Sequence, residues 1–343
     1  MEEQKLSSNL KQKSNVALAF NANKALVILI NKKFWQGVSG PIFAYAFSAV
    51  FVGIFGYIML ASGNIVTFKQ SLAGVIALQV MSVGINSTPQ ALNEFKTSVL
   101  LKRIGATPIK PWMFIVTTAL YYAFIMFTVA LWMLLWIVIW FGAYKVSETN
   151  GMGWQGALGT VPTTAPTQIY HNLFQVIFNS HNDVYALPMP NHQPSINVNN
   201  PTISWGGFFL SIIYTDVVAI FIGVAVVSLT KSAGRVQAIS MPIFFLSMFL
   251  SGQLFPMSTI CQNEVLNGIS YITPFRYTTG LIQMSWSGSN IFDMTQPFIQ
   301  HVSSGATVTV YKLADLWLNF FMPFLFVGLS IFTSIKFFKW NAR

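Results

Sequence analysis

The sequence predicts an all-α integral membrane protein with six transmembrane helices, an N-terminal amphipathic interfacial helix and a re-entrant helical pair before the last span. Only 8% of the 343 residues are charged and 54% are hydrophobic, whereas soluble domains contain roughly 25% charged residues. Several apolar runs are long enough to cross a bilayer, and most basic residues lie between alternate runs. A chain with so few charges cannot cover itself with polar surface, so lipid must cover much of it.

Residues 1–37 are expected to form a cytoplasmic tail and an amphipathic helix. Apolar residues recur at helical spacing between positions 16 and 34, with asparagines and lysines between them. The apolar set is Val16, Phe20, Leu26, Val27, Ile30 and Phe34. Such a helix lies in the membrane interface and leads into the first span. The alternative, in which this segment is the start of a longer first span, stays open.

Residues 38–343 are expected to form one membrane domain. A span needs about 20 apolar residues. Suitable runs cover approximately residues 39–61, 70–92, 111–144, 206–229, 236–255 and 316–338. The third run contains no charged residue between Lys110 and Lys145, which favours a single long helix that is tilted or projects beyond the bilayer.

The basic residues orient these spans. With the N-terminus inside and one crossing per run, only four of the 19 basic residues fall outside, namely Lys69, Lys145, Arg276 and Lys312. Splitting the third run in two would place the C-terminal basic cluster outside. The positive-inside rule therefore favours six spans in the cytoplasmic (plasma) membrane, with both termini in the cytoplasm.

Two segments on the outer side are long. Residues 144–205 are rich in Pro, Asn, Gly and Thr, and their prolines argue against a continuous helix. Residues 256–290 are partly apolar but are interrupted by Gly268, Pro274 and Gly280. Short apolar pieces of about 10–14 residues often enter a membrane without crossing it. We therefore expect a re-entrant pair of short helices at residues 263–284.

The segment between the second and third spans, residues 93–112, is basic and is named the coupling loop below. Residues 94–104 suit a short helix, which Gly105 and Thr107-Pro108 would end. A rigid helix between two spans can act as a handle by which a cytoplasmic protein tilts both. The other interpretation is an ordinary basic cytoplasmic loop.

Two motifs resemble the type-2 ABC-transporter permease family. The first is LKRIGATPIKPW, which ends at Trp112 and is similar to the pattern of that family's coupling loop. The second is FLSGQLFPMSTICQNEVLNGISYITPFRYTTGLIQ, from Phe249 to Gln283, which resembles the family's fifth span and re-entrant region. The six spans and the interfacial helix agree with the resemblance, which covers most of the chain. The long loop at residues 144–205 departs from the family pattern.

The resemblance implies the transmembrane subunit of an ATP-driven exporter. It implies a homodimer or heterodimer with a substrate path at the dimer interface, and ABC ATPase subunits that bind the coupling loops. The implied ATPase-coupling residues are Glu94, Lys102, Arg103, Gly105, Thr107 and Pro108. The substrate path is expected near Leu250, Gln253, Leu254 and Phe255, and the substrate would be hydrophobic or amphipathic, such as a drug or a lipid.

The chain has no G-x-x-x-x-G-K-[ST] phosphate loop. We therefore expect the chain itself to be no enzyme and to bind no cofactor, while ATP and Mg²⁺ bind to the partner ATPase. Membrane lipids are the other expected partner, and no nucleic acid is expected. No catalytic residue or metal ligand is assigned, because the histidines at 171, 181 and 192 have no helical metal-ligand spacing.

Two features of the spans allow more than one interpretation. Asp216 is the only acidic residue inside a predicted span, where a charge costs about 2.5–3.5 kcal/mol. It is assigned to the substrate path, with a structural hydrogen bond as an equally good alternative. Trp132, Trp136 and Trp140 lie on one face of the third span, and they indicate an interfacial belt more than an aromatic substrate platform.

Two other functions compete with export. A secondary transporter or channel would work without ATP, but a single intramembrane acidic residue leaves few members for an ion relay. A membrane scaffold could use the same fold without transport. Co-purification of an ATPase separates these functions from the exporter.

Overall fold

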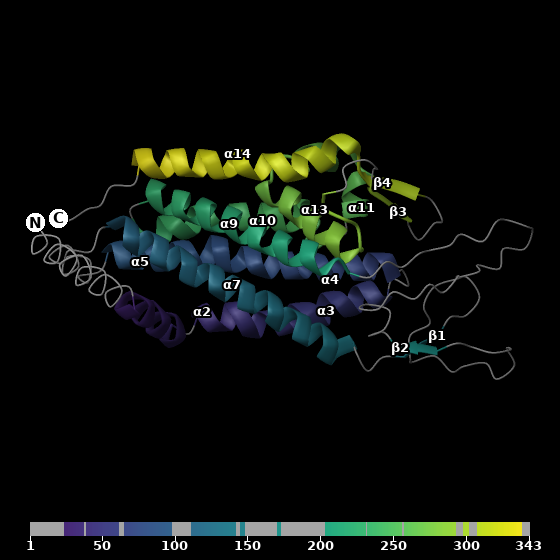
Figure 1. Cartoon of the computed structure of the whole chain (residues 1–343), viewed down its shortest axis with the longest axis horizontal. Helices are drawn as coiled ribbons and strands as arrows, with labels where there is room; N and C mark the ends of the chain where they lie inside the picture. Colours follow the sequence, from purple (N-terminus) through teal and green to yellow (C-terminus); the bar gives the residue numbers. More distant parts are fainter. Residues whose placement is uncertain are drawn as a thin grey trace, which may run out of the picture.

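The computed structural model describes residues 24–37, 39–61, 65–97, 111–141, 145–147, 170–172, 203–230, 232–255, 257–292, 298–301 and 307–337. These residues form a bundle of long helices, with two short antiparallel ribbons at one end (Figure 1). Strand β1 (Lys145–Ser147) pairs with β2 (Tyr170–Asn172), and β3 (Phe298–His301) pairs with β4 (Thr307–Tyr311). These ribbons depart from the predicted all-α class. The other described elements are helices, and they confirm that class.

The first half of the chain contains helices with irregular turns. Residues 24–36 are helical, and α2 (Ser39–Pro41), η1 (Ile42–Ala46) and α3 (Phe47–Ala61) follow as one rod with a π-helical turn. The next rod consists of α4 (Ile65–Ser82), η2 (Val83–Ser87) and α5 (Thr88–Thr97). The third predicted span is a single helix, α7 (Pro111–Phe141), as expected.

The second half continues with α9 (Trp205–Leu229) and α10 (Ala233–Leu250). Three short helices follow, namely α11 (Met257–Cys261), α12 (Glu264–Ser270) and α13 (Pro274–Trp286). Helices α12 and α13 lie where the re-entrant pair was predicted, and α11 was not predicted. The last helix is α14 (Leu313–Phe337).

Among the described residues, five helices are long and apolar enough to cross a membrane. They are Phe68–Lys96, Met113–Phe141, Trp205–Leu229, Ala233–Leu250 and Ala314–Phe337. The first predicted span contains the shorter apolar helix Ala44–Met59. A multi-pass membrane protein is therefore confirmed, and the sixth crossing stays a prediction.

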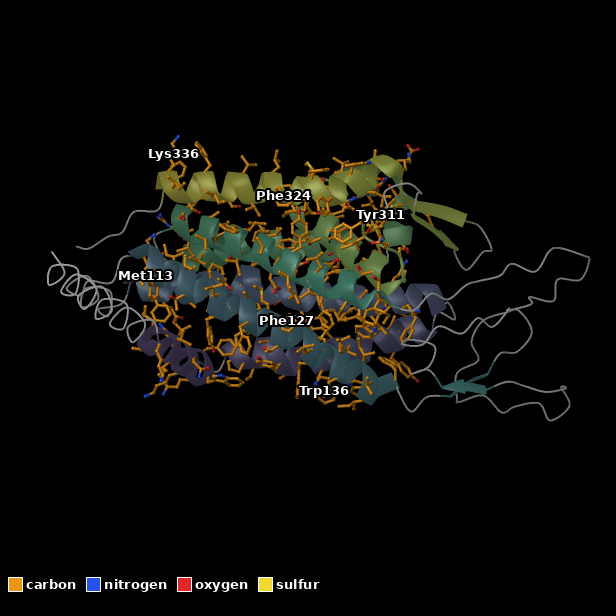
Figure 2. All side chains as sticks on the ribbon, in the orientation of Figure 1. Met113, Phe127, Trp136, Tyr311, Phe324 and Lys336 are labelled. Carbon is orange, nitrogen blue, oxygen red and sulfur yellow. The ribbon has the colours of Figure 1, made fainter. Side chains whose placement is uncertain are left out.

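Consecutive long helices run in alternating directions (Figure 1). Met113 and Lys336 lie at one end of the bundle, whereas Trp136 and Tyr311 lie toward the opposite end (Figure 2). We name the first the basic end and the second the hairpin end, because both ribbons lie there. The alternation places the end of α5 and the start of α7 at the basic end.

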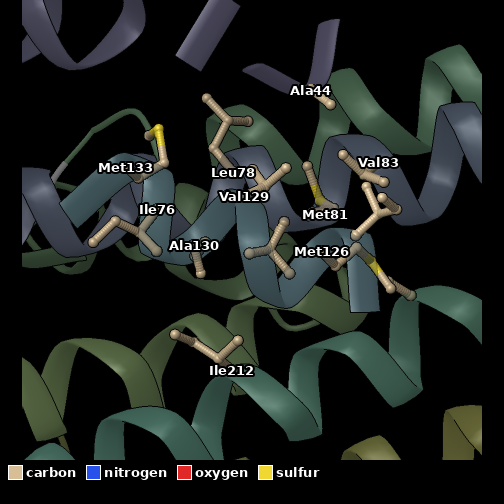
Figure 3. Packing of buried hydrophobic residues seen from close by; sticks show 14 of the residues in the cluster. Ala44, Ile76, Leu78, Met81, Val83, Met126, Val129, Ala130, Met133 and Ile212 are labelled. Atoms are coloured by element: carbon tan, nitrogen blue, oxygen red, sulfur yellow. The ribbon is translucent and has the colours of Figure 1, made fainter. Parts of the chain in front are cut away.

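The second rod lies at the centre of the bundle. Its apolar stretch is 94% buried, whereas that of α14 is only 17% buried and that of α10 only 22%. Figure 3 shows the packing around this rod, with contributions from α4, α7 and α9. The labelled core residues include Ile76, Leu78, Met81, Met126, Val129, Met133 and Ile212. Helices α10 and α14 are therefore the ones that expose most of their surface to lipid or to another protein.

The central rod bends into a π-helical turn where it meets α9. Pro89 has no backbone N–H, and its ring would clash with the carbonyl four residues earlier in a regular α-helix. The wider turn of η2 directly precedes it and relieves that clash. A Cβ on Gly84 of η2 would lie 2.3 Å from the Cβ of Ala219, and one on Gly223 would lie 2.7 Å from the Gly84 carbonyl oxygen. Glycine at these positions lets the two backbones approach closely.

Candidate functional site

The predicted coupling residues lie between positions 94 and 108 of the chain. Glu94 is described, whereas Lys102, Arg103, Gly105, Thr107 and Pro108 lie outside the described residues. We expected the second span to end near residue 92 and a separate helix to start at Glu94. Instead the helix continues through Thr97, so Glu94 lies inside α5. The reason is that Leu92 and Phe95 are buried on one side of this extension, which keeps it packed on the bundle.

Glu94 binds the N-terminal helix. The Lys33 ammonium lies 2.8 Å from Glu94 Oε2, and it also lies 4.4 Å from the centroid of the Phe95 ring. Phe95 in turn makes an edge-to-face contact with Phe114 of α7, with centroids 5.1 Å apart. The ion pair is partly exposed and so contributes only about 0–1 kcal/mol. Its effect is to join three elements at the point where the coupling loop leaves the bundle.

The N-terminal helix packs as the apolar pattern predicted, with one exception. Leu26, Ile30 and Phe34 are buried, whereas Val27 is 41% exposed. Val27 is one residue beyond Leu26, so it lies about 100° further round the helix and off the buried face. The Tyr121 hydroxyl of α7 donates a 2.9 Å hydrogen bond to Asn31 Oδ1. Val16 and Phe20 lie outside the described residues.

Sequence reasoning missed the role of Lys96. Its ammonium donates hydrogen bonds to the carbonyl oxygens of Val227 at 3.2 Å and Thr230 at 3.1 Å. These are carbonyls at the C-terminal end of α9, which has no basic residue in its own last turn. That missing charge was the available signal, because helix C-termini attract cations.

The predicted path residues divide into two groups. Helix α10 ends at Leu250, and the chain then turns through Gly252, whose φ of +76° suits glycine. Gln253 and Leu254 are buried, at 0% and 8% exposure. Phe255 is 45% exposed and stacks on Phe249 of α10, with ring centroids 6.1 Å apart. Leu250 and Phe255 therefore lie at or near the surface, whereas Gln253 and Leu254 belong to the interior.

Gln253 and the turn around it are bound to α13. Gln253 Nε2 donates to Thr279 Oγ1 at 3.2 Å, and Gln283 Nε2 donates to the Gly252 carbonyl oxygen at 2.7 Å. A Cβ on Gly74 of α4 would lie 2.5 Å from the Gln253 carbonyl oxygen. The turn after α10 is thus clamped between α13 and the central rod.

Helix α13 is buried from Phe275 to Trp286, although it is only 13 residues long. Helix α12 before it begins at Glu264 and is preceded by Asn263, whose side chain accepts hydrogen bonds from the N–H groups of Val265 and Leu266. This is the N-cap arrangement that starts a helix. Entry of the pair into the membrane from the hairpin end stays a prediction.

A polar cluster that the sequence did not suggest fastens α13 to α14. The Arg276 guanidinium stacks 3.8 Å from the centroid of the Tyr271 ring and donates to the Asn267 carbonyl oxygen at 3.1 Å. The Tyr271 hydroxyl donates to Asp315 Oδ1, and Asp315 Oδ2 accepts from the Lys312 N–H at 2.9 Å. Burial, with the hydrogen bond to Asp315, raises the pKa of Tyr271 to about 12. The tyrosine therefore stays neutral and keeps donating to the carboxylate at ordinary pH.

Asp216 lies in α9 and is only 4% exposed. Its Oδ1 atom has no hydrogen-bond partner among the described residues. It shares a helix face with Ala219 and Gly223, which pack on Gly84 of the central rod. A buried carboxyl oxygen without a donor is costly, and both interpretations of Asp216 stay open.

The tryptophans of α7 pack on the first rod. Trp132 donates from Nε1 to the Tyr45 carbonyl oxygen at 3.0 Å, and a Cβ on Gly53 would lie 3.1 Å from the Trp140 ring. Through these contacts the tryptophans pack α7 against the first rod. Within the described part of the chain, no group of three or more His, Cys, Asp or Glu residues could hold a metal ion; His181 and His192 lie outside it.

The comparisons with known proteins agree with the resemblance of the two motifs. No curated protein matches the chain. A family model described as ABC-2 family transporter protein matches residues 58–336, from the first span to the last turn of α14. The matched region includes the coupling loop, the turn after α10 and the polar cluster between α13 and α14. Because that match covers most of its length, the chain belongs to the ABC-2 transporter family.

Proposed function

We propose that the chain is the permease subunit of an ATP-driven exporter, which moves a hydrophobic or amphipathic substrate such as a drug or a lipid outward across the cytoplasmic membrane. The family match over residues 58–336 is the observation that supports this function best. ABC-2 permeases in general are non-catalytic transport subunits that work with an ABC ATPase subunit. The motor is therefore a separate polypeptide, which binds ATP and Mg²⁺.

The proposed topology has six spans with both termini in the cytoplasm. Five described helices are able to cross a membrane, and the apolar helix Ala44–Met59 supplies the remaining crossing when its rod is counted from α2 to α3. Lys33, Lys96 and Lys336 belong to elements that end or begin at the basic end, which the positive-inside rule assigns to the cytoplasm. The hairpin end then faces outward.

The proposed mechanism starts at the coupling loop. ATP-driven closure of two ATPase subunits pushes on the loop through Lys102, Arg103, Gly105, Thr107 and Pro108. The long helices then reorient, and substrate passes between the α10 helices of two permease copies. The large exposure of α10 supports this path. Phe245, Leu246 and Phe249 of α10, with Phe255 just after it, present apolar surface that the described residues leave exposed.

Purification of the tagged chain from its native membrane tests the proposal. An ABC ATPase is expected to co-purify, and the reconstituted complex is expected to hydrolyse ATP. Alteration of residues 102–108 should lower that hydrolysis without changing the amount of permease in the membrane. If the chain alone transports substrate under an ion gradient, or if it purifies without any ATPase and supports no transport, the proposal is wrong.

A further inference from the structure

Helix α9 is an uninterrupted 25-residue helix that reaches from one end of the bundle to the other. At 1.5 Å per residue it is about 37 Å long. The central rod beside it contains a π-helical turn, and α10 and α14 each contain an internal proline. Because these irregularities are where helices bend, α9 is the most suitable of these neighbouring helices to transmit a displacement without bending.

The basic end of α9 is held by a residue of another helix. The last carbonyls of a helix have no partners within it and form the negative end of its dipole. In α9, Val227 and Thr230 direct their carbonyl oxygens to the Lys96 ammonium at 3.2 and 3.1 Å. The Thr230 hydroxyl donates to the Val226 carbonyl oxygen at 2.9 Å, and the Val227 carbonyl oxygen also accepts from the Thr230 hydroxyl at 3.4 Å and the Thr230 N–H at 3.3 Å. Lys96 adds a charged donor to Val227 and Thr230. Hydrogen bonds from a charged donor are about twice as strong as those between neutral groups.

Lys96 lies in the last turn of α5, within the first residues of the coupling loop. A displacement of the loop that is transmitted along α5 moves this turn. The same turn contains Glu94, which binds Lys33 of the N-terminal helix. Beside the packing of the central rod on α9, Lys96 therefore gives this turn a charged contact with the end of α9.

The hairpin end of α9 is bound to the elements around the predicted exit. The Ser204 N–H donates to the Ser285 carbonyl oxygen of α13 at 2.9 Å, and the Ser211 and Ser285 hydroxyls lie 3.4 Å apart. The Tyr214 hydroxyl donates to the Phe320 carbonyl oxygen of α14 at 2.5 Å. Helix α13 in turn holds the turn after α10 through Gln283 and Gly252. A contiguous set of contacts thus joins Lys96 to the outer end of α10.

We propose that Lys96 is a positioning residue that fastens α9 to the base of the coupling loop, so that α9 carries the movement of the loop to α13 and the turn after α10. The proposal rests on the proposed function, because it needs a loop that an ATPase displaces. Lys96 touches neither the substrate nor ATP. It sets how much substrate moves for each ATP hydrolysed.

The first test uses the complex of the full chain with its ATPase, in proteoliposomes. Lys96→Met keeps the apolar stem but removes the donors, and Lys96→Arg keeps donors at this position. Lys32→Met, on an exposed lysine of the N-terminal helix, is the matched control. Lys96→Met is expected to leave assembly and ATP hydrolysis near the unaltered level and to lower transport per ATP on the order of tenfold. Lys96→Arg is expected to restore most of it.

Two outcomes of this assay overturn the proposal: Lys96→Met transports as well as Lys32→Met does, or Lys96→Arg is as defective as Lys96→Met. Failure of the unaltered complex to couple ATP to transport would instead contradict the proposed function. The two failures are therefore distinguishable.

The second test keeps Lys96 in place and so does not depend on how its variants fold. Spin labels are attached at Gln90→Cys of α5 and Leu229→Cys of α9, in a Cys261→Ser background that removes the single native thiol. The label distance, measured by pulsed electron resonance, is expected to be the same in the nucleotide-free and the vanadate-trapped complex. A distance that changes between these two states would show that α9 does not follow the loop, and the proposal would be wrong.

Discussion

The side-chain amide of Gln283 donates a 2.7 Å hydrogen bond to the carbonyl oxygen of Gly252, the residue that turns the chain at the end of α10. This contact joins α13, which is buried along almost its whole length, to the end of α10, the helix that is proposed to line the substrate path. Both partners are buried, at 0% exposure for Gln283. The turn after α10 is thus held by a buried polar contact with α13.

Gln283→Leu is expected to destabilise this turn. Removal of the donor leaves the buried Gly252 carbonyl oxygen unsatisfied, which costs about 1–3 kcal/mol. The thermal midpoint of the purified chain in detergent should fall accordingly. Gln262→Leu, at an exposed position just after α11, is the control and should leave the midpoint almost unchanged. Equal midpoints for the two variants would mean that the turn does not depend on Gln283.

Gly84→Ala is expected to disturb the contact between the central rod and α9. The new Cβ would meet the Cβ of Ala219 at 2.3 Å, and overpacking of this kind costs about 1–3 kcal/mol. Gly234→Ala, where a Cβ meets nothing within 4 Å, is the matched control. Retention of folded protein after heating, followed by size-exclusion chromatography, should fall only for Gly84→Ala. A thermostable Gly84→Ala protein would argue that the two helices can move apart at no cost.

Asp216→Asn and Asp315→Asn are expected to have opposite effects on stability. Asp216 has a buried oxygen without a donor, so an amide that cannot become charged should raise the free energy of unfolding, by at most the roughly 3 kcal/mol that a charge at this depth costs. Asp315 accepts from Tyr271 and from the Lys312 N–H, so its amide variant should lose about 1.5–3 kcal/mol. Denaturant titration in one detergent compares the two. A loss of stability in Asp216→Asn would show that its carboxylate is paired.

The same Asp216→Asn protein separates the two roles considered for this residue. Unchanged transport would assign Asp216 to the structure of α9, and lost transport at raised stability would assign it to the substrate path.

Glu94→Lys is expected to weaken the junction between the N-terminal helix and α5. The exposed pair contributes only about 0–1 kcal/mol to stability, so the thermal midpoint should change little. The substitution places two cations side by side at the base of the coupling loop, and ATP-driven transport should fall. Lys33→Glu in the same chain restores opposite charges and should recover most of the activity. A double variant no better than Glu94→Lys would show that the ion pair is not what matters at this position.

The apolar runs and the distribution of lysines were sufficient to predict the membrane class, the single third helix and the places of α12 and α13. These features follow from local composition, because lipid contact and turn residues act over short stretches of chain. The helix of the second span continues five residues beyond the predicted end of that span at residue 92. Burial of Phe95 against Phe114 keeps that helix intact, and a contact with a distant helix cannot be read from local pattern.

Among the predicted site residues, too, local pattern indicated the position of a segment but not the contacts of its side chains. The motifs directed attention to the turn after α10, and the structure places Leu250 to Phe255 there. Periodicity could not tell that Gln253 points into the interior, because a turn with a positive φ breaks the helical repeat. The contacts of Lys96 with α9 and of Tyr271 with Asp315 join residues far apart in sequence. They became visible only once the helices were packed.

The most direct test of the central claim is ATP-dependent transport by the purified permease and its co-purified ATPase, in proteoliposomes of known orientation. A fluorescent amphipathic lipid and a hydrophobic dye serve as probes. Permease–ATPase complexes should move at least one probe from the side that binds ATP to the opposite side, and an ATPase variant that cannot hydrolyse ATP should abolish the movement. Probe movement that is equal with and without ATP hydrolysis would contradict the assignment of this chain as the path of an ATP-driven exporter.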